Sequence, residues 1–215
     1  MENIDAIIQI LKQETQGYFM PIVTKVSLER KPFKVLISCL LSLRTKDQVT
    51  AEASVKLFLL AETPQKMQKL SVARIEKAIY PVGFYKTKAI RIKEICGTLI
   101  ENYGGKTPDE IDELLKLKGV GRKTANLVVT LGYGKLGICV DTHVHRISNR
   151  FGFVNTKTPE QTEFALRKIL PEKYWIIYND LLVSYGQNVC KPISPMCSDC
   201  KLFTYCKRVG VKKFR

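Results

Sequence analysis

The chain has 215 residues, 45% of them hydrophobic, and its 35 lysines and arginines outnumber its 20 aspartates and glutamates, giving a net charge of +15. This length and composition allow one large hydrophobic core or two small ones, and no apolar run approaches the ~20 residues that a membrane-spanning helix needs. The charge favours a polyanionic partner, nucleic acid first, over a basic protein whose lysines are merely solvated.

The first residues, Met1–Asp5, are acidic and lack the basic start of a secretory signal or a transit peptide. We therefore expect a cytoplasmic protein, associated with the nucleoid and carrying no targeting signal. The seven cysteines suit a reducing compartment. Cys39, Cys96 and Cys139 lie among apolar residues and are expected to be small core side chains.

Helical periodicity dominates the sequence. Apolar residues at positions 4, 7, 8 and 11 predict one buried helix face. Pro32 is expected to open a helix over residues 33–43, because proline suits a first helical position. Another helix carries an apolar stripe at positions 89, 92, 96, 99 and 100. No alternating strand pattern is convincing, so the sequence predicts an all-α fold of nine or ten short helices.

Local signals mark helix ends. Capping boxes are predicted where a threonine precedes a glutamine or glutamate by three positions, at Thr45, Thr107 and Thr158. Glycines at 104–105, 132 and 134 predict helix ends. The stretch between Gly132 and Gly134 is the best candidate for a crossing between two helical lobes.

A glycine turn separates two helical patterns within residues 117–125, which read Leu-Lys-Gly-Val-Gly-Arg-Lys-Thr-Ala. Gly119 and Gly121 allow a tight turn with backbone N–H groups at the surface. A helix that opens there adds the positive end of its dipole, which suits a DNA phosphate. Most Gly-x-Gly turns merely connect helices, but the adjacent Arg122 and Lys123 favour phosphate binding.

Four cysteines lie within 17 residues near the end of the sequence, at Cys190, Cys197, Cys200 and Cys206. Such a set binds either a single tetrahedral metal ion, such as zinc, or an iron–sulfur cluster. Residues 186–215 contain seven lysines and arginines, Lys191 among them, and one acid. We expect this basic loop to contact a phosphate backbone.

Three motifs in this order closely resemble the endonuclease III family of helix–hairpin–helix DNA glycosylases: the hairpin at 117–125, Val-Asp-Thr-His-Val-His-Arg at 140–146, and the cysteine spacing. The resemblance covers about residues 20–206. It implies two helical lobes: a six-helix barrel lobe with the hairpin, residues 22–134, and an iron–sulfur lobe, residues 1–21 plus 135–215. It also implies a [4Fe–4S] cluster on the four cysteines.

The resemblance further implies a bifunctional DNA glycosylase and abasic-site lyase of base excision repair. Its substrate would be double-stranded DNA with damaged bases or abasic sites, its model lesion thymine glycol, and its active form a monomer. The catalytic lysine falls on Lys123, which would form a Schiff base with the sugar. The catalytic aspartate falls on Asp141, as stabiliser of positive charge or as base. Spacing alone would make Lys123 a phosphate contact and Asp141 a helix N-cap.

Other family segments suggest how the vacated DNA stack is filled. Phe84 aligns with an apolar wedge; an ordinary core aromatic is the alternative. The basic residues that follow it favour the wedge: Lys86, Lys88, Arg91 and Lys93. Arg44 replaces the glutamine that is usual in this family, and Lys118 the usual proline. The first change leaves the preference for the opposite base open.

His143 is expected to orient Asp141 or contact phosphate, unless it is simply a hydrogen-bonded structural residue. Neither His143 nor His145 is a good metal ligand, because four cysteines already complete one site. The residues expected to contact DNA are Gly119, Val120, Gly121, Arg122, Arg44, Phe84, His143 and Lys191.

Two other functions compete with this interpretation. A monofunctional glycosylase for mispaired bases, adenine included, belongs to the same superfamily, but those relatives lack the Schiff-base lysine that Lys123 supplies. A non-catalytic helix–hairpin–helix module with a zinc site would need neither Lys123 nor Asp141. A brown, iron-containing protein would count against this second alternative.

Overall fold

A computed structural model describes residues 3–18 and 31–215, and every regular element in these ranges is helical. The all-α prediction is therefore confirmed for the described residues, with eleven α-helices, slightly more than predicted. The chain divides into two compact units, Met1–Pro21 with Leu136–Arg215, and Ile22–Lys135. The first of these boundaries falls outside the described residues. Within the described ranges no helix is long and apolar enough to cross a membrane.

Helix α3 (Pro32–Ser42) is the core helix of the unit Ile22–Lys135. It begins with a proline, as predicted, and every residue from Phe33 to Leu41 is buried. Even Lys34 is buried, and its ammonium pairs with Glu62 at 2.6 Å. Four further helices of this unit follow α3 in the sequence: α4 (Asp47–Leu60), α5 (Pro64–Gln68), α6 (Val72–Ile79) and α7 (Tyr85–Tyr103).

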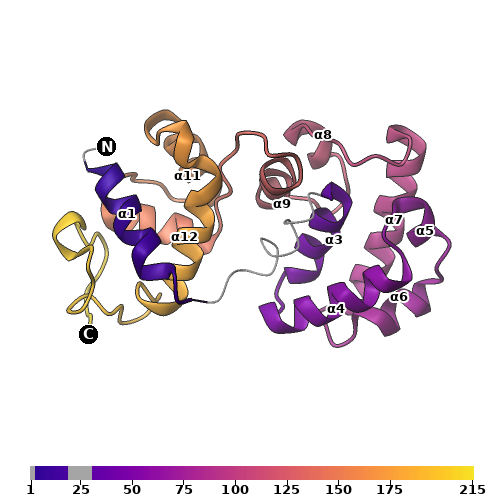
Figure 1. Cartoon of the computed structure of the whole chain (residues 1–215), viewed down its shortest axis with the longest axis horizontal. Helices are drawn as coiled ribbons and strands as arrows, with labels where there is room; N and C mark the ends of the chain where they lie inside the picture. Colours follow the sequence, from indigo (N-terminus) through magenta and orange to yellow (C-terminus); the bar gives the residue numbers. More distant parts are fainter. Residues whose placement is uncertain (1–2, 19–30) are drawn as a thin grey trace. The chain divides into compact units, whose positions relative to one another are not determined.

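Helix α7 carries the predicted apolar stripe. Positions 89, 92, 96 and 99 are buried, and the helix ends at Gly104, whose φ of +59° suits a glycine. Helices α5 and α6 pack against α7, and α3 contacts α4, α7 and the helix that follows the glycine turn (Figure 1). The unit ends in α8 (Ile111–Leu115), α9 (Arg122–Leu127) and the π-helix η1 (Val128–Gly132).

The other unit joins the first helix of the chain to the last third of the sequence. Helix α1 (Ile4–Thr15) buries Ile4, Ile7, Ile8 and Leu11, as predicted. This face packs against α12 (Trp175–Asn188), and both helices share one hydrophobic core (Figure 1). The remaining elements are α10 (Thr142–Phe151), α11 (Pro159–Ile169) and the short turns η2 (Glu172–Tyr174) and η3 (Phe203–Tyr205).

Of the three predicted capping boxes, only the threonine cap at Thr158 forms, and the side chain of Gln161 accepts from the N–H of Lys157 instead of that of Thr158. Thr158 caps α11 by accepting a hydrogen bond from the N–H of Gln161 at 3.2 Å. Thr45 lies outside α4, and its hydroxyl accepts instead from the N–H of Gly83. Thr107 precedes α8 by four residues, and its carbonyl accepts a hydrogen bond from the hydroxyl of Tyr133. A distant residue thus binds the hydroxyl of Thr45, whereas the hydroxyl of Thr107 is buried and has no hydrogen-bond partner in the described part of the chain.

Candidate active site and cysteine cluster

The glycine turn joins α8 to α9, as the sequence predicts. Gly119 and Gly121 are exposed, and Gly119 has a φ of +82°, which a glycine adopts without steric cost. Val120 differs from its neighbours because its side chain is buried and its N–H donates to the carbonyl of Leu117 at 3.0 Å. Val120 therefore stabilises the turn. Backbone N–H groups were predicted to be available at the surface of this turn, but the N–H of Val120 is already hydrogen-bonded.

Lys123 is the second residue of α9 and is exposed. No side chain caps this helix at Gly121, and Lys123 lies in its first turn, close to the positive end of the helix dipole. Behind the lysine lies the buried thiol of Cys39. Burial raises the pKa of Cys39 to about 12, and the charge of Lys123 acts against that rise. Lys123 thus lies in the first turn of the helix after the glycine turn, as the sequence predicts.

Asp141 is the N-cap of α10. Its Oδ1 accepts hydrogen bonds from the backbone N–H groups of His143, at 2.8 Å, and Val144, at 2.9 Å. Oδ2 makes no hydrogen bond within the described part of the chain. The carboxylate is therefore fixed through one oxygen and can present the other to a substrate. Lys123 and Asp141 belong to different compact units.

His143 lies in a half-buried network between α10 and α12. Its Nδ1 is 3.1 Å from the guanidinium of Arg146, which also donates to the carbonyls of Gly186 and Cys190. A side chain at Gly186 would meet His143 Nδ1 at 2.5 Å, so only a glycine allows this approach. These contacts give His143 a structural role, and its contact with DNA stays a prediction.

Two loops of the unit Ile22–Lys135 meet beside α7, and we call them the paired loops: residues 43–46 and 80–84. Arg44 and Phe84, one from each loop, both have a positive φ, +53° and +58°. The guanidinium of Arg44 lies 5.7 Å from the ring centre of Phe84. Phe84 is 63% exposed, so it is not a core aromatic. The paired loops thus present an aromatic ring and a cation together at the surface.

The basic residues after Phe84 favoured its role as a wedge, but three of these four side chains bind other groups of the protein. Lys88 is buried and donates to backbone carbonyls of Leu41 and Leu43. Lys93 donates to the carbonyls of Gln68 and Leu70, and Arg91 pairs with Glu94. Only Lys86 is exposed. The burial of Lys88 could have been inferred from the sequence, because Lys88 precedes Ile92 by four residues and so lies on the same face of the helix as the apolar stripe.

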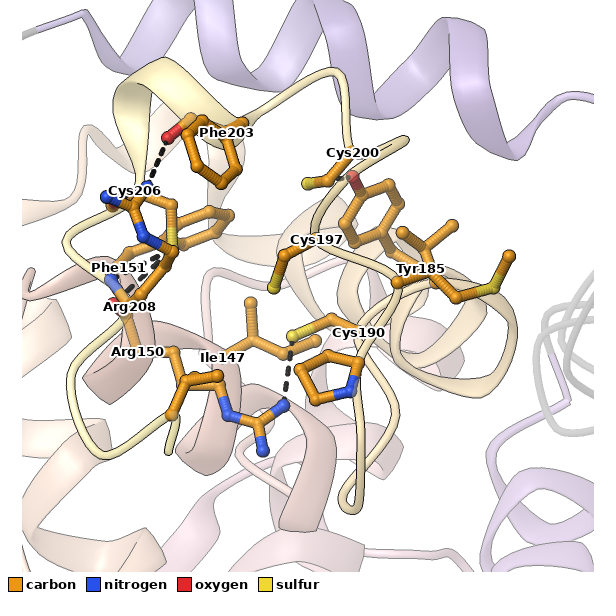
Figure 2. A pocket seen from close by; sticks show the side chains of 14 residues that line it. Ile147, Arg150, Phe151, Tyr185, Cys190, Cys197, Cys200, Phe203, Cys206 and Arg208 are labelled. Carbon is orange, nitrogen blue, oxygen red and sulfur yellow. Dashed lines mark hydrogen bonds between the residues drawn. The ribbon is translucent and has the colours of Figure 1, made fainter. Parts of the chain in front are cut away.

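The four clustered cysteines line one hollow, together with apolar side chains and two arginines. Figure 2 shows their side chains around this common space. Cys190 follows the end of α12, and Cys206 follows η3. The hollow is small and partly open to solvent. Thus a spacing read from the sequence does correspond to one shared site.

Hydrogen bonds to sulfur surround this hollow. Arg150 donates to the sulfur of Cys190 at 3.3 Å, and the hydroxyl of Tyr185 lies 3.0 Å from the sulfur of Cys200. Burial raises the pKa of Cys206 to about 11. Burial and the neighbouring cysteines also raise the pKa of Cys197, against the pull of Arg150. Four thiolates at this site therefore need positive charge at its centre, which iron or another metal would supply.

The backbone around the cysteines is tied to α10. Arg150 donates to the carbonyl of Lys191 at 2.7 Å and to that of Pro192 at 2.7 Å. The end of the chain closes the loop, since the carbonyl of Arg215 accepts from the N–H of Ser198 at 2.8 Å. The carbonyl of Lys191 is bound by Arg150. The predicted contact of Lys191 with DNA would therefore come from its side chain.

Comparisons with known proteins agree with this arrangement. Residues 37–172 match the family model of the HhH-GPD superfamily of base excision DNA repair proteins. The chain is 51% identical over 179 residues to endonuclease III of Thermotoga maritima, which covers 83% of this chain and 84% of that protein. It is 40% identical over 213 residues to the chloroplastic endonuclease III homolog 1 of Arabidopsis thaliana, which covers 94% of this chain and 54% of that protein.

A solved structure is also similar, described as a trapped endonuclease III–DNA covalent intermediate in an estranged-adenine complex. It has a TM-score of 0.84 and 33% sequence identity, and covers 96% of this chain and 95% of that chain. The family model together with the endonuclease III relatives defines a DNA glycosylase of base excision repair that acts as an abasic-site lyase. More narrowly, the chain belongs to the endonuclease III family. The alternative of a non-catalytic binding module is therefore wrong.

Proposed function

We propose that this protein, as a monomer, excises oxidised pyrimidines such as thymine glycol from duplex DNA and then cleaves the strand at the abasic site. The observation that carries the proposal is Lys123, an exposed amine at the open start of the hairpin helix. The similarity to a structure described as a trapped covalent intermediate with DNA supports covalent chemistry.

The reaction requires the damaged nucleotide to leave the duplex, because its C1′ is hidden in the stack. The unprotonated Nζ of Lys123 attacks C1′, and the bond from C1′ to the base breaks; the base leaves with a proton. Loss of a proton from nitrogen and opening of the sugar ring give a Schiff base. A proton then leaves C2′ and the 3′ phosphate departs, which completes β-elimination. Asp141 stabilises the positive charge that develops on the sugar.

A duplex with one thymine glycol tests this proposal against the monofunctional alternative. We expect base release to be followed by a strand break, and sodium borohydride to trap a protein–DNA adduct. An undamaged duplex and a G:A mismatch serve as controls and should give neither product. Base release from thymine glycol without any trapped adduct would contradict the lyase part, whereas action on the mismatch alone would favour an adenine-specific enzyme.

We propose that Cys190, Cys197, Cys200 and Cys206 hold a [4Fe–4S] cluster, which the endonuclease III family generally carries. The shared hollow and the surrounding arginines suit an anionic, multi-atom group. Within the described ranges no group of three or more histidine, cysteine or acidic side chains is close enough to bind a single metal ion. The cysteine spacing, which resembles that of the endonuclease III family, favours a cluster over zinc. The group's contribution would be to fix the basic loop.

The purified protein is expected to be brown and to contain about four irons per chain. Cys206→Ala should lose the iron and the visible absorption, because one of four ligands is missing. Cys96→Ala is the matched control: Cys96 is buried in α7, in the other unit, and its loss should leave the colour unchanged. A colourless protein with one bound zinc would contradict the proposal.

A further inference from the structure

We infer that Lys88 is a positioning residue for lesion recognition: it ties the paired loops together, so that Arg44 and Phe84 enter the DNA stack as one rigid unit. The inference rests on the proposed function. Lys88 itself contacts neither substrate nor reacting atoms, and it acts through the loops that it holds.

The first support is the geometry of the ammonium group. Its Nζ donates to the carbonyls of Leu41 at 2.8 Å and Leu43 at 2.6 Å, and to the hydroxyl of Thr45 at 3.2 Å. A lysine ammonium has three donors, and all three are used here. The carbonyl of Leu41 lies in the last turn of α3 and that of Leu43 lies just after it, where helical partners are missing. Lys88 therefore fixes the start of the loop that carries Arg44.

The second support is the contact between the loops. The hydroxyl of Thr45 also accepts from the N–H of Gly83, at 3.2 Å, so this one oxygen joins both loops to Lys88. A side chain at Gly83 would meet the carbonyl oxygen of Arg44 at 2.7 Å, and only a glycine permits this approach. The two loops are thus connected to each other through Thr45 and Gly83, and both are connected to Lys88 through the hydroxyl of Thr45.

The third support is backbone strain. A non-glycine residue in the left-handed region is sterically strained, and such conformations persist only when their surroundings hold them. Arg44 and Phe84 both adopt it, and both are exposed. Lys88 binds the carbonyl of Leu43, the residue before Arg44. Phe84 is the N-cap of α7, the helix that carries Lys88. Lys88 and Thr45 therefore make contacts beside both strained residues.

The fourth support is the cost of burying this charge. Lys88 is 8% exposed, and burial lowers its pKa to about 8, so at pH 7 it remains mainly an ammonium. No carboxylate pairs with it within the described part of the chain. An apolar side chain would fill the space without this cost. The ammonium is thus explained by the loop acceptors that it holds.

The test compares Lys88→Met, which keeps the chain length but removes the donors, with Lys86→Met on the exposed side of the same helix turn. Binding is measured to a duplex with a tetrahydrofuran abasic-site analogue and to the undamaged duplex. Lys88→Met should lower the preference for the damaged duplex about tenfold, as expected for lost hydrogen bonds to a charged group. Lys86→Met should weaken binding to both duplexes by the same factor, because it would remove only a phosphate contact.

Two further measurements separate positioning from damage to the fold. Borohydride trapping on a single-stranded abasic oligonucleotide needs no wedge, so Lys88→Met should match the native chain there. Combined with Phe84→Ala, Lys88→Met should add little further loss of preference, since both changes disable the same unit. Equal losses on every substrate, or an undiminished effect of Lys88→Met in the Phe84→Ala background, would overturn the inference.

If Lys88→Met does not fold, as judged by its helical circular dichroism, Thr45→Val decides the question. It removes the hydroxyl that joins the loops and keeps the side-chain shape. A reduced preference for the damaged duplex supports the inference, and an unchanged preference overturns it. Failure of the lyase proposal is distinguishable, because the native chain would then form no adduct on single strands, while duplex preference would remain measurable.

Discussion

A Lys123→Gln variant is expected to form no borohydride-trapped adduct with DNA, to cut no strand at abasic sites, and to release thymine glycol roughly 10³-fold more slowly or worse. Glutamine keeps most of the length and polarity of the side chain but has no amine to attack C1′. Lys123 is exposed, so the change should alter the free energy of unfolding by no more than about 0.5 kcal/mol. Single-turnover trapping and thermal unfolding measure both effects.

Arg122→Gln is the matched control, since Arg122 is the adjacent residue at the same helix start. It should weaken binding to every duplex and lower the dependence of affinity on salt by about one phosphate contact. At saturating protein its adduct should still form. An adduct that persists in Lys123→Gln would assign the nucleophile to another amine and would sink the proposed role of Lys123.

Local signals in the sequence were sufficient for several features of the site. The glycine turn, the cap at Asp141 and the cysteine spacing each depend on residues close together in the chain, and the structure contains all three. A cap or a turn is decided by the backbone nearby, so its pattern survives tertiary packing. Exposure of Phe84 was also foreseen, although through the resemblance rather than through its own residue type.

Features that depend on distant residues were missed. The acceptors of Lys88 lie 43 to 47 positions away in the sequence, so its place on the apolar stripe of α7 indicates burial but not which carbonyls it binds. Thr45 failed as a helix cap for the same reason, because its partner Gly83 is 38 positions away. The paired loops are therefore a product of packing, and they could be recognised only once the fold was known.

Asp141→Asn is expected to lower the rate of base release by about 10²–10⁴-fold, the usual contribution of a positioned acid–base group. The structure lets this loss be separated from a loss of folding. Asparagine caps a helix about as well as aspartate, and its side-chain oxygen can accept from the N–H groups of His143 and Val144 as Oδ1 does now. The amide takes the place of Oδ2, so the change removes the negative charge and leaves the cap.

Asp141→Ala removes both features and provides the comparison. It should lose the same activity and, in addition, about 1 kcal/mol of stability, because the N–H groups at the start of α10 lose their acceptor. Single-turnover base release at saturating protein, set beside thermal unfolding, distinguishes the two contributions. If Asp141→Asn keeps its stability and loses its rate, the charge acts on the substrate. If it keeps both, Asp141 is a helix cap only, and the carboxylate that stabilises the sugar must be sought elsewhere.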